Sequence, residues 1–291
     1  MNQISFPNLG IDLKIDPVAF TVFGKEIMWY GIILTTAIIL SVLYVYYRNK
    51  ENGIVNDDYL DIAIFTVVFG VVGARLYYVL TSFDQYDSFW DVFKIWEGGI
   101  AIYGAVIGGA AAAICTLKFK KMNVLKFFNG LAPGCMLGQI IGRWGNFVNA
   151  EAYGSVEKFE FFGRTFDISS SKSLPWVMEA NGVLCQPTFL YESIWNLIGF
   201  VLINIFYKKK KYDGAPVLWY LAWYGFGRMF IEGLRTDSLY IGGIKISQLL
   251  GLLCFVVCVF LIIFFAIKKV KYDKPLYKEV KTTEVEDGNI D

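Results

Sequence analysis

Seven apolar stretches, each close to the length that crosses a lipid bilayer, constrain this chain more than any other feature of its sequence. They cover residues Met28–Tyr47, Tyr59–Leu80, Gly98–Leu117, Val124–Phe147, Thr188–Tyr207, Ala215–Leu234 and Ile246–Ile267. A helix needs about 20 apolar residues to span the hydrocarbon core of a membrane. Charged residues make up only 18% of the 291 residues and the net charge is +1, which argues against a soluble enzyme and a nucleic-acid binder. The sequence predicts an all-α polytopic membrane protein with about seven transmembrane helices.

Lysine and arginine are unevenly distributed over the connections between these stretches. One set of alternate connections, together with the C-terminal tail, holds more than twice as many of them as the other set. The rich set comprises Arg48, Lys50, Lys118, Lys120, Lys121, Lys126, Lys208–Lys211 and the lysines that follow Ile267. Because basic residues are retained on the cytoplasmic side, we expect the N-terminus outside and the C-terminus in the cytoplasm.

Two segments outside the spans are long enough to form structure of their own. Residues 1–27 mix apolar residues with Asp and Pro and are predicted to form an arm on the outer membrane surface. Residues 151–187 are predicted to form a small extracytoplasmic cap, inserted into the transmembrane domain of residues 28–267. Within this cap, Glu157–Ser169 alternates like a pair of short strands. Residues 268–291 are interpreted as a charged cytoplasmic tail.

The chain contains no histidine, which removes several kinds of chemistry at once. Ser-His and Cys-His pairs, histidine-ligated metals and a histidine general base are all excluded. The five cysteines form no CxxC pair, and most of them fall in apolar stretches, so we interpret them as buried structural thiols. The sequence therefore predicts neither a metal site nor a disulfide framework, and no cofactor.

Ionisable side chains lie inside the predicted spans, where they are costly and favour a functional interpretation. They are Arg75, Arg143, Glu192, Arg228, Glu232 and, at the edge of a span, Arg235. The expected orientation places all of them in the outer half of the bilayer, and Tyr30 and Tyr103 fall at a similar depth. Arginine outnumbers glutamate in this set, and guanidinium groups bind phosphate bidentately. The pattern predicts a pocket for the anionic head group of a phospholipid in the outer leaflet.

Two simpler explanations of these charges stay open. An arginine near a helix end reaches the head groups by snorkelling and needs no further role. Internal pairing is the other explanation, because Arg228, Glu232 and Arg235 share one helix face. Glu192 is likewise available as a partner for Arg143.

One run at the outer end of the fourth span, Gly142–Gly154, combines several unusual features in the sequence GRWGNFVNAEAYG. Arg143 and Asn146 are three residues apart and share a helix face, while Asn149 and Glu151 follow where the backbone can turn. Glycines spaced by four let a neighbouring helix approach closely. They are Gly134, Gly138 and Gly142. A tight helix-packing site would account for the glycines and asparagines but not for a charged arginine.

This run closely resembles the signature of bacterial prolipoprotein diacylglyceryl transferases, and the resemblance covers nearly the whole chain. Trp29–Gly31, Gln186–Glu192 and Gly227–Arg235 are similar to further elements of that family in the first, fifth and sixth spans. Two positions depart from the family pattern. Tyr103 stands where many members have the histidine of a His-Gly-Gly element, and Asn129 stands where an aspartate is common. The resemblance therefore leaves the general base open.

The resemblance implies a transferase of the bacterial cell membrane whose active site faces the outer leaflet. Such an enzyme moves the diacylglyceryl group of phosphatidylglycerol onto the thiol of the lipobox cysteine in a prolipoprotein signal peptide. Glycerol 1-phosphate is released, and this is the first step of lipoprotein maturation. The implied partners are phosphatidylglycerol, the prolipoprotein and the lipid bilayer, with no nucleic acid.

Carried over to this chain, the family's motifs supply candidate site residues. Arg143 and Arg228 are expected to stabilise the charge that develops on the leaving phosphate and to favour the thiolate of the substrate. Tyr103 is expected to orient the reactants, and Glu151 is a candidate proton acceptor. The residues expected to bind phosphatidylglycerol are Arg143, Asn146, Asn149, Gly154, Tyr30, Glu232 and Arg235.

A transporter or channel for an anionic solute is the alternative, since arginine lines such pathways too. Against it, the charges stop in the outer half of the membrane and no polar path continues inward. An intramembrane protease is disfavoured, because the chain lacks histidine and shows no pair of aspartates within its spans.

Overall fold

The computed structural model describes residues 1–50, 56–83, 86, 88–94, 98–210 and 212–268 of the chain. They form two compact parts: a first part built from residues 1–45 and 128–268, and a second part built from residues within 46–127. The predicted tail, residues 268–291, lies outside the described residues except for Lys268.

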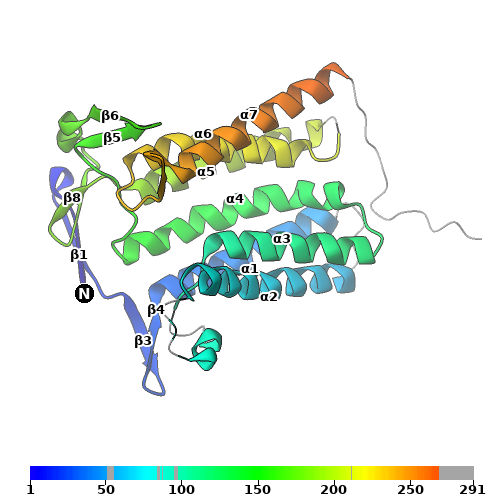
Figure 1. Cartoon of the computed structure of the whole chain (residues 1–291), viewed down its shortest axis with the longest axis horizontal. Helices are drawn as coiled ribbons and strands as arrows, with labels where there is room; N and C mark the ends of the chain where they lie inside the picture. Colours follow the sequence, from blue (N-terminus) through cyan, green and yellow to red (C-terminus); the bar gives the residue numbers. More distant parts are fainter. Residues whose placement is uncertain (51–55, 84–85, 87, 95–97, 211, 269–291) are drawn as a thin grey trace, which may run out of the picture. The chain divides into compact units, whose positions relative to one another are not determined.

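Seven long helices in the described residues occupy the seven predicted apolar stretches (Figure 1). They are α1 (Trp29–Lys50), α2 (Asn56–Thr81), α3 (Ile102–Phe119), α4 (Val124–Val148), α5 (Thr188–Phe206), α6 (Ala215–Leu234) and α7 (Ile246–Ile267). All but α6 are long and apolar enough to cross a membrane. This confirms a largely helical, multi-pass membrane protein. α6 carries Arg228, Glu232 and several Trp and Tyr residues, which lower its hydropathy. That α6 also crosses the membrane, as a seventh span in addition to the other six, stays a prediction.

The third helix begins later than the sequence predicts. The apolar stretch was expected from Gly98, but α3 starts at Ile102. Gly98 and Gly99 have φ angles of +94° and +75°, a left-handed conformation that interrupts a helix and that glycine adopts without strain. Their carbonyl groups are instead bonded by a side chain of α2, as described below.

The segments outside the helices fold together in the first part. The arm contains β1 (Asn2–Phe6), β2 (Ile11–Ile15), β3 (Val18–Val22) and β4 (Lys25–Met28), and the 151–187 segment contains β5 (Lys158–Phe161), β6 (Arg164–Asp167), β7 (Met178–Ala180) and β8 (Val183–Cys185). One sheet has the strand order β2-β1-β7-β8, and Ile4 lies opposite Ala180. The arm and the predicted cap therefore share a sheet.

The predicted strand pair within Glu157–Ser169 is confirmed as the antiparallel hairpin of β5 and β6. The serine-rich stretch that follows, Ser169–Ser173, forms a short 3-10 helix. Another small hairpin, β9 (Tyr240–Ile241) with β10 (Ile244–Lys245), connects α6 to α7.

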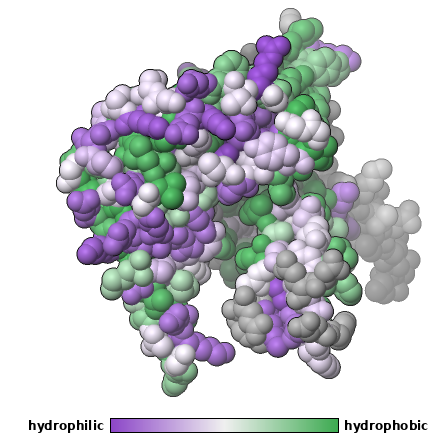
Figure 2. Space-filling view, turned by 60° about the vertical axis from the view of Figure 1, so that its left-hand side comes forward, coloured by the Kyte–Doolittle hydropathy of each residue, from purple (hydrophilic) through white to green (hydrophobic). Residues whose placement is uncertain are grey.

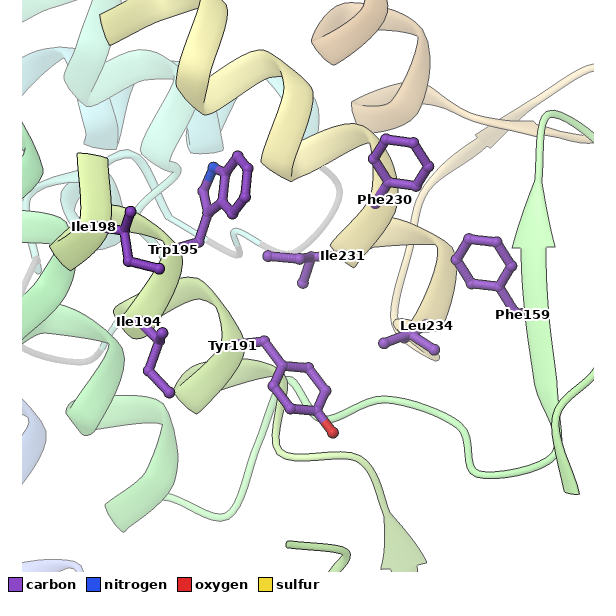
Figure 3. A pocket seen from close by; sticks show the side chains of 8 residues that line it. All are labelled: Phe159, Tyr191, Ile194, Trp195, Ile198, Phe230, Ile231 and Leu234. Carbon is purple, nitrogen blue, oxygen red and sulfur yellow. The ribbon is translucent and has the colours of Figure 1, made fainter. Parts of the chain in front are cut away.

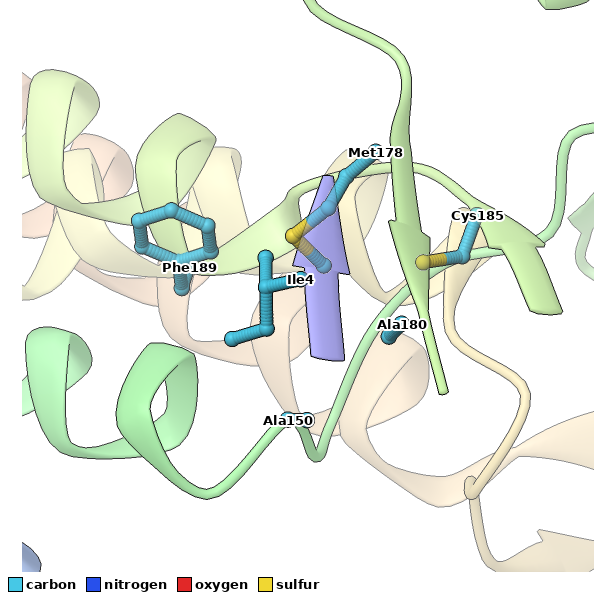
Figure 4. Packing of buried hydrophobic residues seen from close by; sticks show 6 residues of the cluster. All are labelled: Ile4, Ala150, Met178, Ala180, Cys185 and Phe189. Atoms are coloured by element: carbon cyan, nitrogen blue, oxygen red, sulfur yellow. The ribbon is translucent and has the colours of Figure 1, made fainter. Parts of the chain in front are cut away.

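A small apolar core joins the shared sheet to the helix ends (Figure 4). It consists of Ile4, Ala150, Met178, Ala180, Cys185 and Phe189. Burial raises the pKa of the Cys185 thiol to about 12, which fits the interpretation of this cysteine as a structural thiol. The core thereby fixes the turn after α4 and the start of α5, the two places from which site residues project.

The surface of the molecule differs sharply between strands and helices. Hydrophilic residues gather over the strand-bearing end of the first part in Figure 2. Among the residues of the strands, Lys14, Arg164 and Asp167 are exposed. The helices instead expose large apolar side chains. On α7, Leu253 and Phe260 are 59% and 63% exposed. Such apolar surface is expected where helices face lipid.

Glycines bring α1 and α4 close together, as their spacing predicts. A Cβ atom on Gly134 would lie 2.3 Å from Val45 Cγ2, and one on Gly138 would lie 2.8 Å from Ser41 Oγ. No heavy atom of the described residues lies within 4 Å of a Cβ on Gly142. The close approach is therefore confirmed for two of the three glycines.

The second part is built on a tight pair of helices, α2 and α3. A Cβ atom on Gly73 would lie 2.5 Å from the carbonyl oxygen of Gly104, so the two backbones touch. At the other end of the pair, Lys120 Nζ lies 2.7 Å from a carboxylate oxygen of Asp58 and 2.7 Å from one of Asp61. The hydrogen bonds to these two carboxylates raise the pKa of Lys120.

Candidate active site

The signature run ends α4 with a well-defined turn. The N–H of Ala150 donates to the carbonyl of Phe147, and the N–H of Glu151 donates to that of Asn146. Ala150 has a φ of +50°, so these bonds form a Schellman motif with alanine at the left-handed position, where glycine is usual. Holding a non-glycine residue in this conformation costs about 1–3 kcal/mol. The surrounding core provides the packing that maintains it.

This turn folds Glu151 back over the side chains of the last helical turn. Asn146 Nδ2 donates to Glu151 Oε1 at 3.0 Å, and Asn146 Oδ1 accepts from Arg143 Nη1 at 3.3 Å. Three predicted site residues are thus linked in one chain of hydrogen bonds. Arg143 sits at the inner end of this chain and Glu151, which is exposed, at the outer end.

Glu192, near the start of α5, is the centre of the charge cluster. Its Oε2 lies 2.5 Å from Arg143 Nη2, and its Oε1 accepts from Arg228 Nη1 at 2.7 Å. Its side chain is only 4% exposed, so the carboxylate depends on these two guanidinium groups for compensation. The pairing of Glu192 with Arg143 is confirmed, and it brings together arginines from α4 and α6.

The end of α6 adds a second layer of charges. Arg228 Nη2 lies 2.6 Å from Glu232 Oε2, one helical turn further on. Arg235 Nη1 lies 4.0 Å from Glu192 Oε1, and its guanidinium also forms a bidentate pair with Asp237 at 2.9 and 2.7 Å. The pairing of Glu232 with an arginine is therefore confirmed.

Within the first part, each arginine of the site meets a carboxylate. Arg143, Arg228 and Arg235 meet Glu192, Glu232 and Asp237, so the charges are balanced in number. Asp237, which follows Arg235 by two residues, was not among the predicted residues. A balanced cluster still binds anions, because each guanidinium has five N–H donors and a single carboxylate engages only some of them.

Arg75 has a structural role in the second part. Its guanidinium donates to the carbonyl oxygens of Asp91 at 2.7 Å, Val92 at 2.8 Å, Gly98 at 2.6 Å and Gly99 at 2.8 Å. These carbonyls belong to the connection between α2 and α3, and they satisfy a buried arginine without an anion. Arg75 therefore shapes this connection, which explains its place near the end of a span without a bound phosphate.

Tyr103 also belongs to the second part, at the start of α3. Its ring is 39% exposed and packs against Tyr77 with a centroid distance of 6.2 Å. The role of its hydroxyl in orienting the reactants stays a prediction.

The other predicted lipid-binding residues surround the signature turn in different ways. A Cβ atom on Gly145 would lie 2.5 Å from the Tyr30 ring, so Tyr30 covers α4 two residues from Arg143. The Oδ1 atom of Asn149 is buried and has no hydrogen-bond partner among the described residues. Such an atom is costly to bury unless something bonds it.

Gly154 is a framework residue in the described contacts. Its N–H and carbonyl both bond Gln186, and a Cβ atom there would lie 2.9–3.0 Å from Thr188, Gln186 and Leu234. Only glycine fits where these three segments meet, so the turn after α4, the start of α5 and the end of α6 are held in contact.

An open apolar groove lies between α5 and α6 on the first part (Figure 3). Its volume is about 380 Å³, and it is lined by Phe159, Tyr191, Ile194, Trp195, Ile198, Phe230, Ile231 and Leu234. None of the paired charges lines it. The groove suits hydrocarbon rather than a head group, and it is not the place where the arginines meet.

The family of the chain follows from comparison with known sequences. The sequence model of the family described as prolipoprotein diacylglyceryl transferase matches residues 17–264. The chain belongs to this family. A phosphatidylglycerol–prolipoprotein diacylglyceryl transferase of Clostridioides difficile strain 630 is 41% identical over 239 residues, which are 82% of this chain and 90% of the relative. The relative with that name in Listeria innocua is 37% identical over 93% of this chain and 96% of its own length.

One departure from the family's pattern has a clear structural setting. Asn129 is fully buried near the start of α4, where its Nδ2 donates to Asp213 Oδ1 at 3.1 Å and its Oδ1 accepts from the N–H of Gly214 at 2.8 Å. The amide thus uses both its donor and its acceptor to tie α4 to the residue that precedes α6. An ionised aspartate would offer only acceptors and could not donate to Asp213.

Proposed function

We propose that this chain transfers the diacylglyceryl group of phosphatidylglycerol to the thiol of the lipobox cysteine of prolipoproteins, and that glycerol 1-phosphate is released. The observation that carries the proposal is the buried carboxylate of Glu192, which holds Arg143 of the family's signature run beside Arg228 of α6. Two guanidinium groups fixed in this way are preorganised for a phosphate group.

In the proposed reaction, the sulfur of the substrate cysteine attacks the carbon of the diacylglyceryl group that is bonded to the phosphate oxygen. A carbon–sulfur bond forms, the carbon–oxygen bond breaks, and the electron pair leaves with the phosphate, which becomes a monoester. The thiol gives up its proton. Arg143 and Arg228 oppose the negative charge that grows on the phosphate oxygen, so they act more strongly on the transition state than on the bound lipid.

The remaining predicted residues have supporting positions in this proposal. Asn149 accepts a hydrogen bond from a hydroxyl of the lipid head group through its Oδ1 atom, which has no partner among the described residues. Asn146 holds the side chains of Arg143 and Glu151 in place by hydrogen bonds to both. Glu151, the exposed carboxylate of the turn, is the candidate proton acceptor. Tyr30 packs against α4 beside Arg143, and Glu232 and Arg235 pair with the other charges of the site. Gly154 permits the close contact between the turn after α4, the start of α5 and the end of α6.

We further propose that α6 also crosses the membrane, which brings the number of spans to seven. In this topology the N-terminus and the 151–187 segment lie outside, and the active site faces the outer leaflet of the cell membrane. The expected result is selective labelling of single cysteines introduced at Ser170 and Lys210 into a cysteine-free variant. An impermeant maleimide on intact cells should label position 170 and leave position 210 unlabelled until the cells are opened. The opposite labelling would contradict the orientation.

The proposed activity is tested by reconstitution. Purified protein in lipid vesicles containing phosphatidylglycerol, mixed with a peptide that carries a lipobox cysteine, should release glycerol phosphate and add one diacylglyceryl group to the peptide. Both products are measured, the first enzymatically and the second by mass spectrometry. They should appear in equal amounts, because one transfer makes one of each.

Matched reactions separate this activity from other sources of lipid breakdown. A peptide with serine in place of the lipobox cysteine should yield neither product. Glycerol phosphate without modified peptide would indicate a phospholipase and contradict the transferase proposal.

Tyr103→Phe keeps the ring and loses the hydroxyl. It should lower turnover roughly ten- to a thousandfold, because the hydroxyl is expected to orient the reactants or exchange a proton. Unchanged turnover would reduce Tyr103 to a packing residue.

A further inference from the structure

Lys245 is a buried lysine that the proposed mechanism does not use. It stands directly before α7, at the end of β10, and its side chain is only 3% exposed. Burying an ammonium group is costly unless its charge is compensated and its N–H donors find acceptors. The acceptors that it has found therefore indicate what the lysine does.

These acceptors are backbone carbonyls at the end of α6. Lys245 Nζ donates to the carbonyl oxygen of Arg235 at 2.6 Å, of Glu232 at 3.1 Å and of Gly233 at 3.4 Å. The carbonyl of Leu234 accepts from the N–H of Ser155 at 2.7 Å. The last carbonyls of a helix lack partners within the helix, and a cation there also opposes the negative end of the helix dipole. Lys245 thus closes the end of α6.

A carboxylate from the β5–β6 hairpin completes the arrangement. Glu160 Oε2 lies 3.4 Å from Lys245 Nζ and accepts from the Tyr240 hydroxyl at 2.6 Å. The hydrogen bond from Tyr240, together with the charge of Lys245, lowers the pKa of Glu160 against the opposing effect of its partial burial. Gln248 Nε2 donates to the carbonyl of Glu160 at 2.7 Å and to that of Met229 at 3.2 Å. The hairpin is therefore fastened to α6 from the start of α7.

The residues held in this way are residues of the candidate active site. The backbone of Glu232 is bonded by Lys245 while its side chain pairs with Arg228. Arg235 is held at its carbonyl while its guanidinium lies 4.0 Å from Glu192. Displacing catalytic groups by about 1 Å costs roughly a hundredfold in rate. The hydrogen bonds of the Lys245 ammonium group therefore help to fix the positions of the Glu232 and Arg235 side chains.

We propose that Lys245 is a positioning residue: through the last turn of α6 it holds Glu232 and Arg235 in place for the phosphatidylglycerol head group. This inference rests on the proposed function. Lys245 acts through the backbone, because it is too deeply buried to touch the lipid itself.

The test is Lys245→Met, which removes the charge and the donors but keeps a flexible side chain. The KM for phosphatidylglycerol should rise roughly five- to fiftyfold, while the KM for the lipobox peptide stays within about twofold. Lys14→Met, at an exposed lysine of β2, is the matched control and should change neither value. Direct binding of phosphatidylglycerol to the purified proteins, followed by native mass spectrometry, should weaken by a similar factor.

A second variant covers the case in which Lys245→Met does not fold. Glu160→Gln keeps the shape of the side chain and removes its charge, so it should raise the KM for phosphatidylglycerol by roughly two- to fivefold. Unchanged affinity for phosphatidylglycerol in the folded variants overturns the positioning role. A loss of active protein with both KM values unchanged overturns it too, since that is the signature of a purely structural lysine. Wild-type protein that binds the lipid without releasing glycerol phosphate would contradict the proposed function alone.

Discussion

Glu192→Gln should lower turnover by about 10²- to 10³-fold, although the substitution changes the shape of the side chain hardly at all. The carboxylate bonds Arg143 through one oxygen and Arg228 through the other. An uncharged amide offers one acceptor and two N–H donors, and those donors face guanidinium groups that only donate. Without the carboxylate, the guanidinium groups of Arg143 and Arg228 repel each other. They are then no longer held in the arrangement in which both can bind one phosphate.

The loss of stability in this variant should be large as well. Removing one partner of a buried ion pair costs about 3–5 kcal/mol, which thermal unfolding in detergent measures. Turnover is therefore compared per folded molecule. Glu157→Gln is the matched control, because Glu157 pairs with Lys172 at the surface and should change turnover by less than about twofold. Turnover of Glu192→Gln within about threefold of wild type would show that convergence of the arginines is not needed.

Arg143→Lys should be impaired by about 10²- to 10³-fold, even though the positive charge is kept. Arg143 bonds Glu192 and Asn146 through two different nitrogens of its planar fork. Lysine has a single nitrogen at the end of its chain and is expected to satisfy one of these partners but not both while also meeting a phosphate. Turnover in the reconstituted assay, with protein amount and folding held equal, is the measurement.

The same experiment decides between phosphate binding and snorkelling. An arginine that merely reaches the head groups is replaced by lysine with little effect, because both side chains carry their charge on a long flexible stem. Arg164→Lys, at an exposed position of β6, is the matched control and should be close to wild type. Equal activities of Arg143→Lys and Arg164→Lys would refute phosphate clamping by Arg143.

The helices and their approximate ends were predictable because they follow from local composition. An apolar stretch near the spanning length forms a helix whatever lies beside it, and the alternation in Glu157–Ser169 similarly marked a hairpin. The late start of α3 was not predictable in this way. It depends on two left-handed glycines whose carbonyls bond Arg75, a residue of the preceding helix.

The candidate site was predictable in its residue types but not in its pairing. Arg143, Arg228 and Glu232 were identified from charge inside apolar stretches, and the family resemblance placed them in one site. That Glu192 would join two arginines from different helices requires the tertiary structure, since they lie 49 and 36 residues away along the chain. Asp237 and Lys245 were not predicted because they lie outside the apolar stretches. Charged residues are common there and do not by themselves indicate a functional site.

The sheet that joins the arm to the 151–187 segment has a consequence for biosynthesis. β1 pairs on one side with β2, which is made immediately after it, and on the other side with β7, whose residue Ala180 lies opposite Ile4. At about 5–20 residues per second, the ribosome takes roughly 10–35 seconds to add the intervening chain. During that interval one edge of β1 has unpaired backbone groups and is open to wrong partners. The hairpin of β1 and β2 is thus synthesised well before the strand that completes its sheet.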